Sequence, residues 1–352
     1  MNEQDFEGSN DESYSSHEDS VSSISEKGHS HHHERRDGLG PQAHMKPSMM
    51  KAWYAQFADR GKTGGFKHNS ALFTDEAANS KTIFTKLGAQ LAKIMLTKMF
   101  ELTPEAQEEL RKVDGYGFDI FKLRKYTDNN ELTVILPWVL AKHGLIGSCS
   151  VDFTNLMCFV RSLAAGYKTI TYHNQTHAAD VCQTFNYFAV EGGVKDKIKL
   201  DNLEQMSCYI SAALHDFEHP GVTNVFLVSM NDKIAVRHND VSVLENHHLA
   251  ASFRLMTKDE NCNWQVRMSR ADFKRVRQVI IQTVLSTDMT KHFTELGHLN
   301  SRMRDEDFDP VAEAKDKELF IGFMFHLSDI SNPAKPWELC RLWADLIFVE
   351  FF

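Results

Sequence analysis

Beyond Leu102, apolar side chains recur every three to four residues through long segments that contain almost no proline. This spacing places them on one face of an α-helix, whereas the alternating pattern of a half-buried strand is hardly visible. Thr103, followed by Pro104 and early acidic residues, predicts the start of a helix. The sequence therefore predicts an all-α fold, a compact multi-helix bundle in which ligands and metals bind between facing helices. Helical segments are expected at 132–142, 152–165, 177–190, 203–214, 241–256, 270–287 and 317–328.

The N-terminal part of the chain has a different composition. Residues 1–45 are rich in Ser, Glu, Asp and His and poor in large apolar side chains, which is typical of a disordered tail. Residues 46–100 indicate a linker that ends in a basic amphipathic helix, Lys81–Phe100. Such a helix most often packs on its own domain, and calmodulin or a similar regulator is the less favoured alternative partner. The helical domain is expected at 101–352.

The charge balance and the cysteines limit the function classes. The formal net charge is −9, with 39 basic against 48 acidic residues, whereas non-specific nucleic-acid binding needs a basic face. Six cysteines are scattered without a CxxC pair, which indicates reduced thiols rather than a disulfide framework. The N-terminus lacks the apolar stretch of a signal peptide, and no segment approaches the roughly 20 apolar residues of a membrane span. We therefore expect a cytoplasmic protein with no membrane span and no nucleic-acid partner.

The candidate chemistry lies in a short motif, His-Asp-Phe-Glu-His at 215–219. Residues four apart project from the same face of a helix, so His215 and His219 are expected to reach one point, with the aspartate beside them. His173 and His177 repeat this spacing upstream. A single histidine on an apolar helix is more often a hydrogen-bonded core residue than a ligand, but two such pairs together favour a metal site.

A further acid downstream completes a possible ligand set, since imidazole and carboxylate groups are common ligands of zinc. The predicted ligands of one zinc-like ion are His177, His215, Asp216 and Asp329. Asp216 could also bridge to a second, harder ion, because a carboxylate has two oxygens and magnesium prefers oxygen ligands. Two ions of this kind activate water and clamp a phosphoryl group, which favours phosphoester hydrolysis. The zincin motif His-Glu-x-x-His is excluded because its second position is Asp216, and Glu218 falls too late.

Several segments follow one another in a recognisable order. They are Tyr172–Val181, His215–Asn224, Leu244–His248, Ser286–Met289 and Asp329–Pro333. In this order and spacing they resemble the class I cyclic nucleotide phosphodiesterases, and the resemblance covers about Tyr116 to Phe352. It implies the all-α fold of the HD-type phosphohydrolases. It also implies hydrolysis of a 3′,5′-cyclic nucleotide to the 5′-monophosphate, which terminates a second-messenger signal.

The resemblance implies roles for individual residues at the metal centre. The ligand set above would hold Zn²⁺, with Asp216 shared with Mg²⁺ or Mn²⁺. His219, Glu245 and Thr287 would position the waters of the second ion. His173 would be the general acid that protonates the O3′ leaving group.

For the cyclic nucleotide, the resemblance implies a pocket around the base. Tyr172 would form a wall of this pocket, and Asn332 would contact the purine and favour cAMP slightly over cGMP. Met289, Ile347 and Phe351 would line or clamp the ring, because apolar contacts above and below a planar base favour its binding.

The chain ends at Phe352, inside a helix that the resembling family continues. The family's purine-binding glutamine and second aromatic clamp lie in helices beyond this point. We therefore expect a catalytic domain, residues 101–352, that lacks its last helices, binds metal and hydrolyses cyclic nucleotide weakly or not at all. Two alternatives stay open. One is a catalytically impaired metal-binding module, and the other is a different HD-type nucleotide phosphohydrolase, which would leave His173 and Glu245 without a role.

Overall fold

The computed structural model describes residues 93, 94 and 96–352, and every regular element within these residues is a helix. The prediction of an all-α fold is therefore confirmed for this part of the chain. The α-helices are α3 (Pro104–Arg111), α4 (Ile120–Tyr126), α5 (Glu131–Lys142), α6 (Leu145–Ser148), α7 (Phe153–Gly166), α8 (Gln175–Val190), α9 (Val194–Lys197), α10 (Asn202–Leu214), α11 (Asn224–Ser229), α12 (Lys233–Arg237), α13 (Val243–Lys258), α14 (Arg270–Leu285), α15 (His292–Arg302), α16 (Ala314–Asp329) and α17 (Trp337–Phe351). Short 3₁₀ helices are η2 (Glu260–Cys262), η3 (Met289–Lys291) and η4 (Asn332–Ala334).

Local signals place the helix boundaries close to the predicted ones. Thr103 caps α3, because its hydroxyl accepts a backbone N–H of the first turn at 3.2 Å. α10 begins with a capping box in which Asp201 and Glu204 each accept the other's backbone N–H. α8 begins after Asn174, whose side chain accepts the N–H of Thr176 at 2.8 Å.

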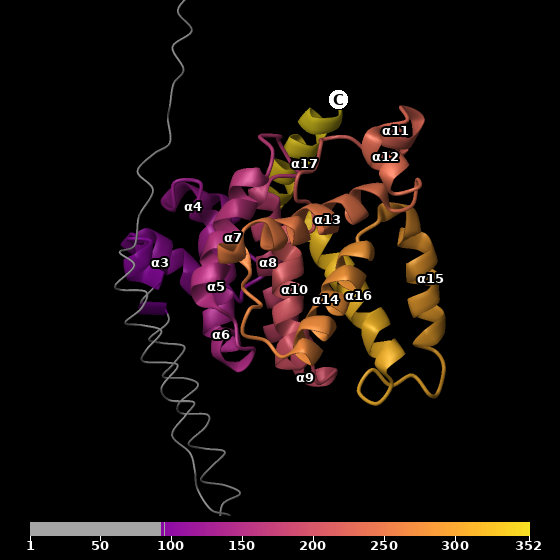
Figure 1. The fold of residues 1–352 in the computed structure, drawn as a ribbon, viewed down its shortest axis with the longest axis horizontal. Helices are drawn as coiled ribbons and strands as arrows, with labels where there is room; N and C mark the ends of the chain where they lie inside the picture. Colours follow the sequence, from indigo (N-terminus) through magenta and orange to yellow (C-terminus); the bar gives the residue numbers. More distant parts are fainter. Residues whose placement is uncertain (1–92, 95) are drawn as a thin grey trace, which may run out of the picture. The chain divides into compact units, whose positions relative to one another are not determined.

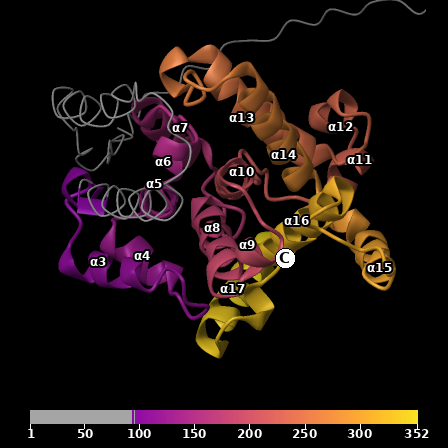
Figure 2. The same cartoon turned by 90° about the horizontal axis from the view of Figure 1, so that it is seen from below.

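α8 and α10 form the centre of the bundle. Residues 204–214 of α10 and residues 176–186 of α8 are all buried, so neighbouring helices enclose both on every side. Figures 1 and 2 show α10 in the middle of the helices in two perpendicular views. α10 packs against α8 and α14, and α8 also contacts α5 and α16.

The ends of three helices meet at one place in this core. His177 lies in the first turn of α8, His215 directly follows α10, and Asp329 is the last residue of α16. The candidate ligand atoms of these residues and of Asp216 all lie within 4.8 Å of one another. The bundle therefore brings together segments that are far apart in the sequence.

The N-terminal predictions lie almost wholly outside the described residues. This holds for the tail at 1–45 and for most of the linker at 46–100. Of the predicted amphipathic helix, residues 93, 94 and 96–99 are helical. Within the described residues, no helix is both long enough and apolar enough to cross a membrane.

Candidate metal centre

The His-Asp-Phe-Glu-His segment is a turn that follows α10. The helix ends at Leu214, and residues 215–218 form turns in which Glu218 adopts a left-handed φ of 62°. Backbone hydrogen bonds that span three residues replace the helical ones here. The prediction that His215 and His219 project from one helix face is therefore wrong, because the chain has left the helix between them.

Packing against α7 holds this turn in place. Phe217 is buried in the turn, and its ring meets the ring of Tyr167 edge-on with centroids 5.9 Å apart. A Cβ on Gly166, the last residue of α7, would lie 2.5 Å from the Phe217 ring, so a glycine is required at this close approach. The hydroxyl of Tyr167 donates to the carbonyl of Ala213 at 3.1 Å. The position of Asp216, next to Phe217, is thus set by core packing.

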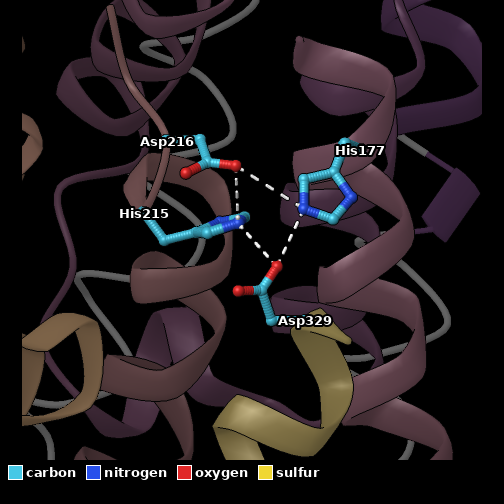
Figure 3. Close-up of side chains that lie close together, drawn as sticks. All are labelled: His177, His215, Asp216 and Asp329. Atoms are coloured by element: carbon cyan, nitrogen blue, oxygen red, sulfur yellow. Dashed lines mark hydrogen bonds and ion pairs between the residues drawn. The ribbon is translucent and has the colours of Figure 1, made fainter. Parts of the chain in front are cut away.

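The four predicted ligands meet at one point, with their nitrogen and oxygen atoms turned toward one another (Figure 3). Nε2 of His177 lies 2.8 Å from Oδ1 of Asp329 and 3.5 Å from Oδ2 of Asp216. Nε2 of His215 lies 3.2 Å from Oδ2 of Asp216 and 3.3 Å from Oδ1 of Asp329. Two imidazole nitrogens and two carboxylate oxygens therefore face a common centre.

The environment of His215 fits a bound cation. Its Nδ1 donates to the carbonyl of Ala212 at 3.0 Å, which leaves the lone pair of a neutral ring on Nε2. That buried nitrogen makes no hydrogen bond of acceptable geometry, although oxygens of Asp216 and Asp329 lie close to it. A lone pair that faces two carboxylates is repulsive unless a positive charge, either a proton on this nitrogen or a metal ion, lies between them. A divalent metal ion satisfies all of these atoms at once.

The charges of the two carboxylates control protonation at this centre. Burial by itself lowers the pKa of His215, but Asp216 and Asp329 raise it well above its usual range. Burial by itself raises the pKa of Asp216, but His215 holds it well below its usual range. The pKa of Asp329 is lowered in the same way, against burial, by His215 and by the hydrogen bond with His177. The two carboxylates stay ionised and require a positive partner.

Asp216 faces a second group of histidines with its other oxygen. Oδ1 of Asp216 lies 3.8 Å from Nε2 of His248, and His219 completes this group. Nδ1 of His248 donates to the carbonyl of Phe217 at 2.6 Å, which turns Nε2 toward the aspartate. Burial lowers the pKa of His248 to about 4, so the ring is neutral at pH 7. The sequence predicted no role for His248, although it lies in one of the segments that carry the resemblance.

Glu245 and Thr287 border the same space from other elements. Glu245 lies in the first turn of α13, where the side-chain amide of Asn224 donates to its two carboxylate oxygens at 3.3 and 3.1 Å. Burial, followed by the nearby charge of Asp288, raises the pKa of Glu245 to about 7. Thr287 is buried just after α14. Asn224 therefore holds the carboxylate of Glu245 in position.

The ring of His173 is oriented by a hydrogen bond with Glu350, a residue that the sequence did not predict to have a role. Nδ1 of His173 lies 2.5 Å from Oε1 of Glu350, and Oε2 accepts the backbone N–H groups of Tyr172 and His173 at 2.6 and 3.0 Å. Burial by itself lowers the pKa of His173, but Glu350 and Asp216 raise it. His219 stacks on His173 with ring centroids 4.0 Å apart, and burial together with His173 lowers its pKa well below the usual range. Of these two stacked rings, His173 is the one that carries a proton more readily.

A cavity of about 690 Å³ opens over this centre. All the residues predicted to bind substrate or the waters of the second ion line it, as does His173. These residues are Tyr172, His219, Glu245, Thr287, Met289, Asn332, Ile347 and Phe351. Asp216 and Asp329 also reach the cavity, whereas His177 and His215 are not among its lining residues. Met289 is 57% exposed and Asn332 is 4% exposed.

A family model described as 3′5′-cyclic nucleotide phosphodiesterase matches residues 172–352, which include every residue of this centre. The chain belongs to this family. The match begins later than Tyr116, where the resemblance was expected to start.

Phosphodiesterases from several animals align with more of the chain. It is 34% identical over 322 residues to the dual specificity calcium/calmodulin-dependent 3′,5′-cyclic nucleotide phosphodiesterase 1C of Mus musculus, covering 88% of this chain and 43% of the relative. It is 34% identical over 287 residues to the high affinity cAMP-specific and IBMX-insensitive 3′,5′-cyclic phosphodiesterase 8 of Drosophila melanogaster, covering 80% of this chain and 31% of the relative. The chain thus spans less than half the length of these curated relatives.

In this phosphodiesterase domain, a buried ion pair supports the wall of the cavity. Nζ of Lys335 lies 2.6 Å from Oδ1 of Asp180, and the other oxygen of Asp180 accepts the side-chain amide of Asn332 at 3.0 Å. The carbonyl oxygen of that amide accepts the hydroxyl of Tyr172 at 2.5 Å. Because a carboxylate only accepts hydrogen bonds, this network determines which way the amide of Asn332 is turned. One donor and one acceptor of Asn332 are therefore already engaged within the protein.

Proposed function

We propose that this chain hydrolyses a 3′,5′-cyclic nucleotide to the 5′-monophosphate with two divalent ions, Zn²⁺ and Mg²⁺ or Mn²⁺. The observation that carries the proposal is the buried Nε2 of His215, which faces the oxygens of Asp216 and Asp329 without a hydrogen bond. Such an arrangement calls for a cation, and it lies under a cavity in a domain of the phosphodiesterase family. His177, His215, Asp216 and Asp329 would hold the zinc-like ion. Asp216 would be shared with the second ion.

When bound, these ions would polarise the phosphoryl group and lower the pKa of a coordinated water. A residue of the chain then has to donate a proton to the leaving group. Hydrolysis breaks the bond between phosphorus and O3′, water adds to phosphorus, and O3′ takes up a proton. His173 lines the cavity with its Nδ1 held by Glu350, so Nε2 is the ring nitrogen that would deliver this proton. Glu350 acts through His173 by orienting the ring and by raising its pKa.

The second group of polar residues would order the waters of the harder ion. His219, Glu245 and Thr287 all line the cavity, as the resemblance implies for this role. The neutral ring of His248 beside Asp216 adds an acceptor, Nε2, that no sequence signal indicated. Such outer partners tune metal affinity and the orientation of bound water.

The base would lie against apolar side chains in the same cavity. Ile347 and Phe351 on α17 line one part of it, Met289 lies at an exposed position, and Tyr172 forms a wall. Asn332 supports a slight preference for cAMP, because the donor and the acceptor of its amide that are not engaged by Asp180 and Tyr172 could pair with the N7 and N6 atoms of adenine. The relatives are named as dual specificity and cAMP-specific enzymes, which is consistent with either nucleotide.

Two further proposals concern the setting of the enzyme. A cytoplasmic location accords with the composition of the chain. Regulation by calmodulin through Lys81–Phe100 accords with the name of the calcium/calmodulin-dependent relative. Binding of a peptide of this segment to calmodulin, with and without calcium, tests that regulation directly.

The test of the function uses the metal-loaded chain with cAMP and, separately, cGMP, and chromatography of the 5′-monophosphate. We expect turnover that requires added metal and that falls at least a hundredfold in His173→Ala while metal binding is retained. Retained metal without any turnover, for either nucleotide, would favour the impaired metal-binding module. Turnover of a nucleoside triphosphate instead would favour another HD-type phosphohydrolase.

A further inference from the structure

Two cysteines outside the metal centre face each other. Sγ of Cys158 on α7 lies 3.0 Å from Sγ of Cys262 in η2, although the two residues are 104 positions apart in the chain. The hydroxyl of Ser162 lies 3.5 Å from the Cys262 sulfur, and a carboxylate oxygen of Asp259 lies 3.9 Å from it. Neither cysteine takes part in the proposed reaction.

The surrounding fold holds the two thiols in place. The side-chain amide of Asn155 on α7 donates to the carbonyls of Glu260 and Asn263, at 3.2 and 3.0 Å. The backbone N–H of Asp152 donates to the carbonyl of Trp264 at 3.0 Å. These bonds tie the beginning of α7 to the segment around η2 on both sides of Cys262. The chain has therefore already closed the long loop between the cysteines before any bond joins them.

The separation of the sulfurs lies between the value for two thiolates on one metal ion and the value for a disulfide. Two thiolates on one tetrahedral zinc, each about 2.3 Å from the ion, lie about 3.8 Å apart. The observed 3.0 Å is shorter than that. A disulfide requires a separation of about 2.05 Å, so the sulfurs have to approach by about 1 Å. Cys158 is partly exposed whereas Cys262 is 2% exposed, so a small oxidant reaches Cys158 first.

We propose that Cys158 and Cys262 form a reversible disulfide when the protein meets a hydroperoxide. The sulfur of Cys158 attacks one peroxide oxygen, the O–O bond breaks, and Cys158 becomes a sulfenic acid with release of an alcohol, or of water when the oxidant is hydrogen peroxide. The sulfur of Cys262 then attacks the sulfenic sulfur, the S–O bond breaks, and one water leaves. Two thiols lose two electrons in total, and these reduce the hydroperoxide. A dithiol reductant reduces the disulfide back to two thiols.

The disulfide would restrain the part of the domain that carries the metal centre. The loop between the two cysteines contains His177, His215 and Asp216, and α13 with Glu245 ends directly before η2. Linking the ends of so long a loop stabilises the folded state mainly by restricting the unfolded chain. Oxidation should therefore raise the melting temperature of the whole domain.

The test is peptide mapping of the full chain after treatment with hydrogen peroxide, digested without reduction and analysed by mass spectrometry. We expect a Cys158–Cys262 linked peptide, a fall in titratable thiols from six to four, and a rise of about 5–10 °C in Tm that dithiothreitol reverses. Burial raises the pKa of Cys158 to about 12, so the rate should increase about tenfold per pH unit between pH 7 and 9.

Matched variants separate this pair from the other cysteines. Cys158→Ser and Cys262→Ser should each abolish the linked peptide and the rise in Tm. Cys340→Ser, which alters another partly buried cysteine, should change neither. The proposal is overturned if oxidised wild-type protein stays folded and loses thiols without a Cys158–Cys262 peptide. It is also overturned if wild-type protein retains one more zinc ion per chain than Cys158→Ser, since that indicates a metal site.

Discussion

Replacing Lys335 by methionine tests how the fold supports the metal centre. Lys335 and Asp180 form an ion pair in which the side chains are 0% and 1% exposed and the charged atoms lie 2.6 Å apart. Asp180 lies one helical turn after the proposed ligand His177, and Lys335 follows the proposed ligand Asp329 closely in the chain. The pair thus joins two of the segments that carry the ligands.

The expected cost follows from the burial of the pair. Methionine fills much of the volume of lysine but leaves the Asp180 carboxylate without its positive partner. Removing one member of a buried ion pair typically costs about 3–5 kcal/mol, because the remaining charge stays buried. The hydroxyl of Thr184 also loses its contact with Nζ at 3.2 Å, and Asn332 remains the donor that still reaches Asp180. We therefore expect Lys335→Met to lower the free energy of unfolding by about 3–5 kcal/mol.

A double-mutant cycle in urea, followed by tryptophan fluorescence, measures this effect. The metal concentration is held constant, because binding to the folded state adds its own stabilisation. Asp180→Asn should also destabilise, since it leaves the ammonium group unpaired. The double variant, which carries neither charge, should lie within about 2 kcal/mol of wild type.

The reasoning about the ion pair would be refuted if both single variants unfolded within about 1 kcal/mol of wild type. It would also be refuted if the two effects simply added in the double variant, because additivity means that the charges do not interact.

Three further outcomes are expected. Glu350→Gln should lower kcat about tenfold to a hundredfold and move the alkaline limb of the pH profile of kcat to lower pH, because the pKa of His173, the proposed general acid, falls without the carboxylate. An unchanged pH profile would contradict this. Burial raises the pKa of Glu131, so ionisation of this side chain lowers the free energy of unfolding as pH rises through the ordinary carboxyl range. The free energy of unfolding of Glu131→Gln, measured in urea, should equal that of wild type near pH 4 and exceed it at pH 7. Gly166→Ala should lower the free energy of unfolding by about 1–3 kcal/mol, because the added Cβ would lie 2.5 Å from the Phe217 ring. A Tm equal to that of wild type would argue against this close packing.

The periodicity of apolar residues was sufficient to predict the long helices α5, α7, α8, α10, α13, α14 and α16, because burial against neighbouring helices dominates at those positions. α15 was not among the predicted segments. The ligand types also indicated which residues converge, since buried histidines and acids need partners. The shape of the motif at 215–219 could not be predicted in this way. The identity of Phe217 does not reveal that its ring packs against Gly166, and this contact accompanies the departure from helical geometry.

The partner of His173 left no signal in the sequence. Glu350 lies 177 positions away on α17, in a segment that otherwise follows an ordinary amphipathic pattern. The engagement of Asn332 with Tyr172 and Asp180 was hidden for the same reason, because each contact joins distant segments. Pairings of this kind depend on how helices pack, and spacing along the chain reports only on neighbours within one helix.

The most direct test of the metal centre is the zinc affinity of the full chain by competition with a chelator. Asp329→Asn removes one ligand charge with little change of volume, and Asp345→Asn is the matched control because its side chain is 68% exposed on α17. We predict tight zinc binding by wild type and by Asp345→Asn, and at least a hundredfold weaker binding by Asp329→Asn. Equal zinc affinity in Asp329→Asn and wild type would contradict the proposed centre.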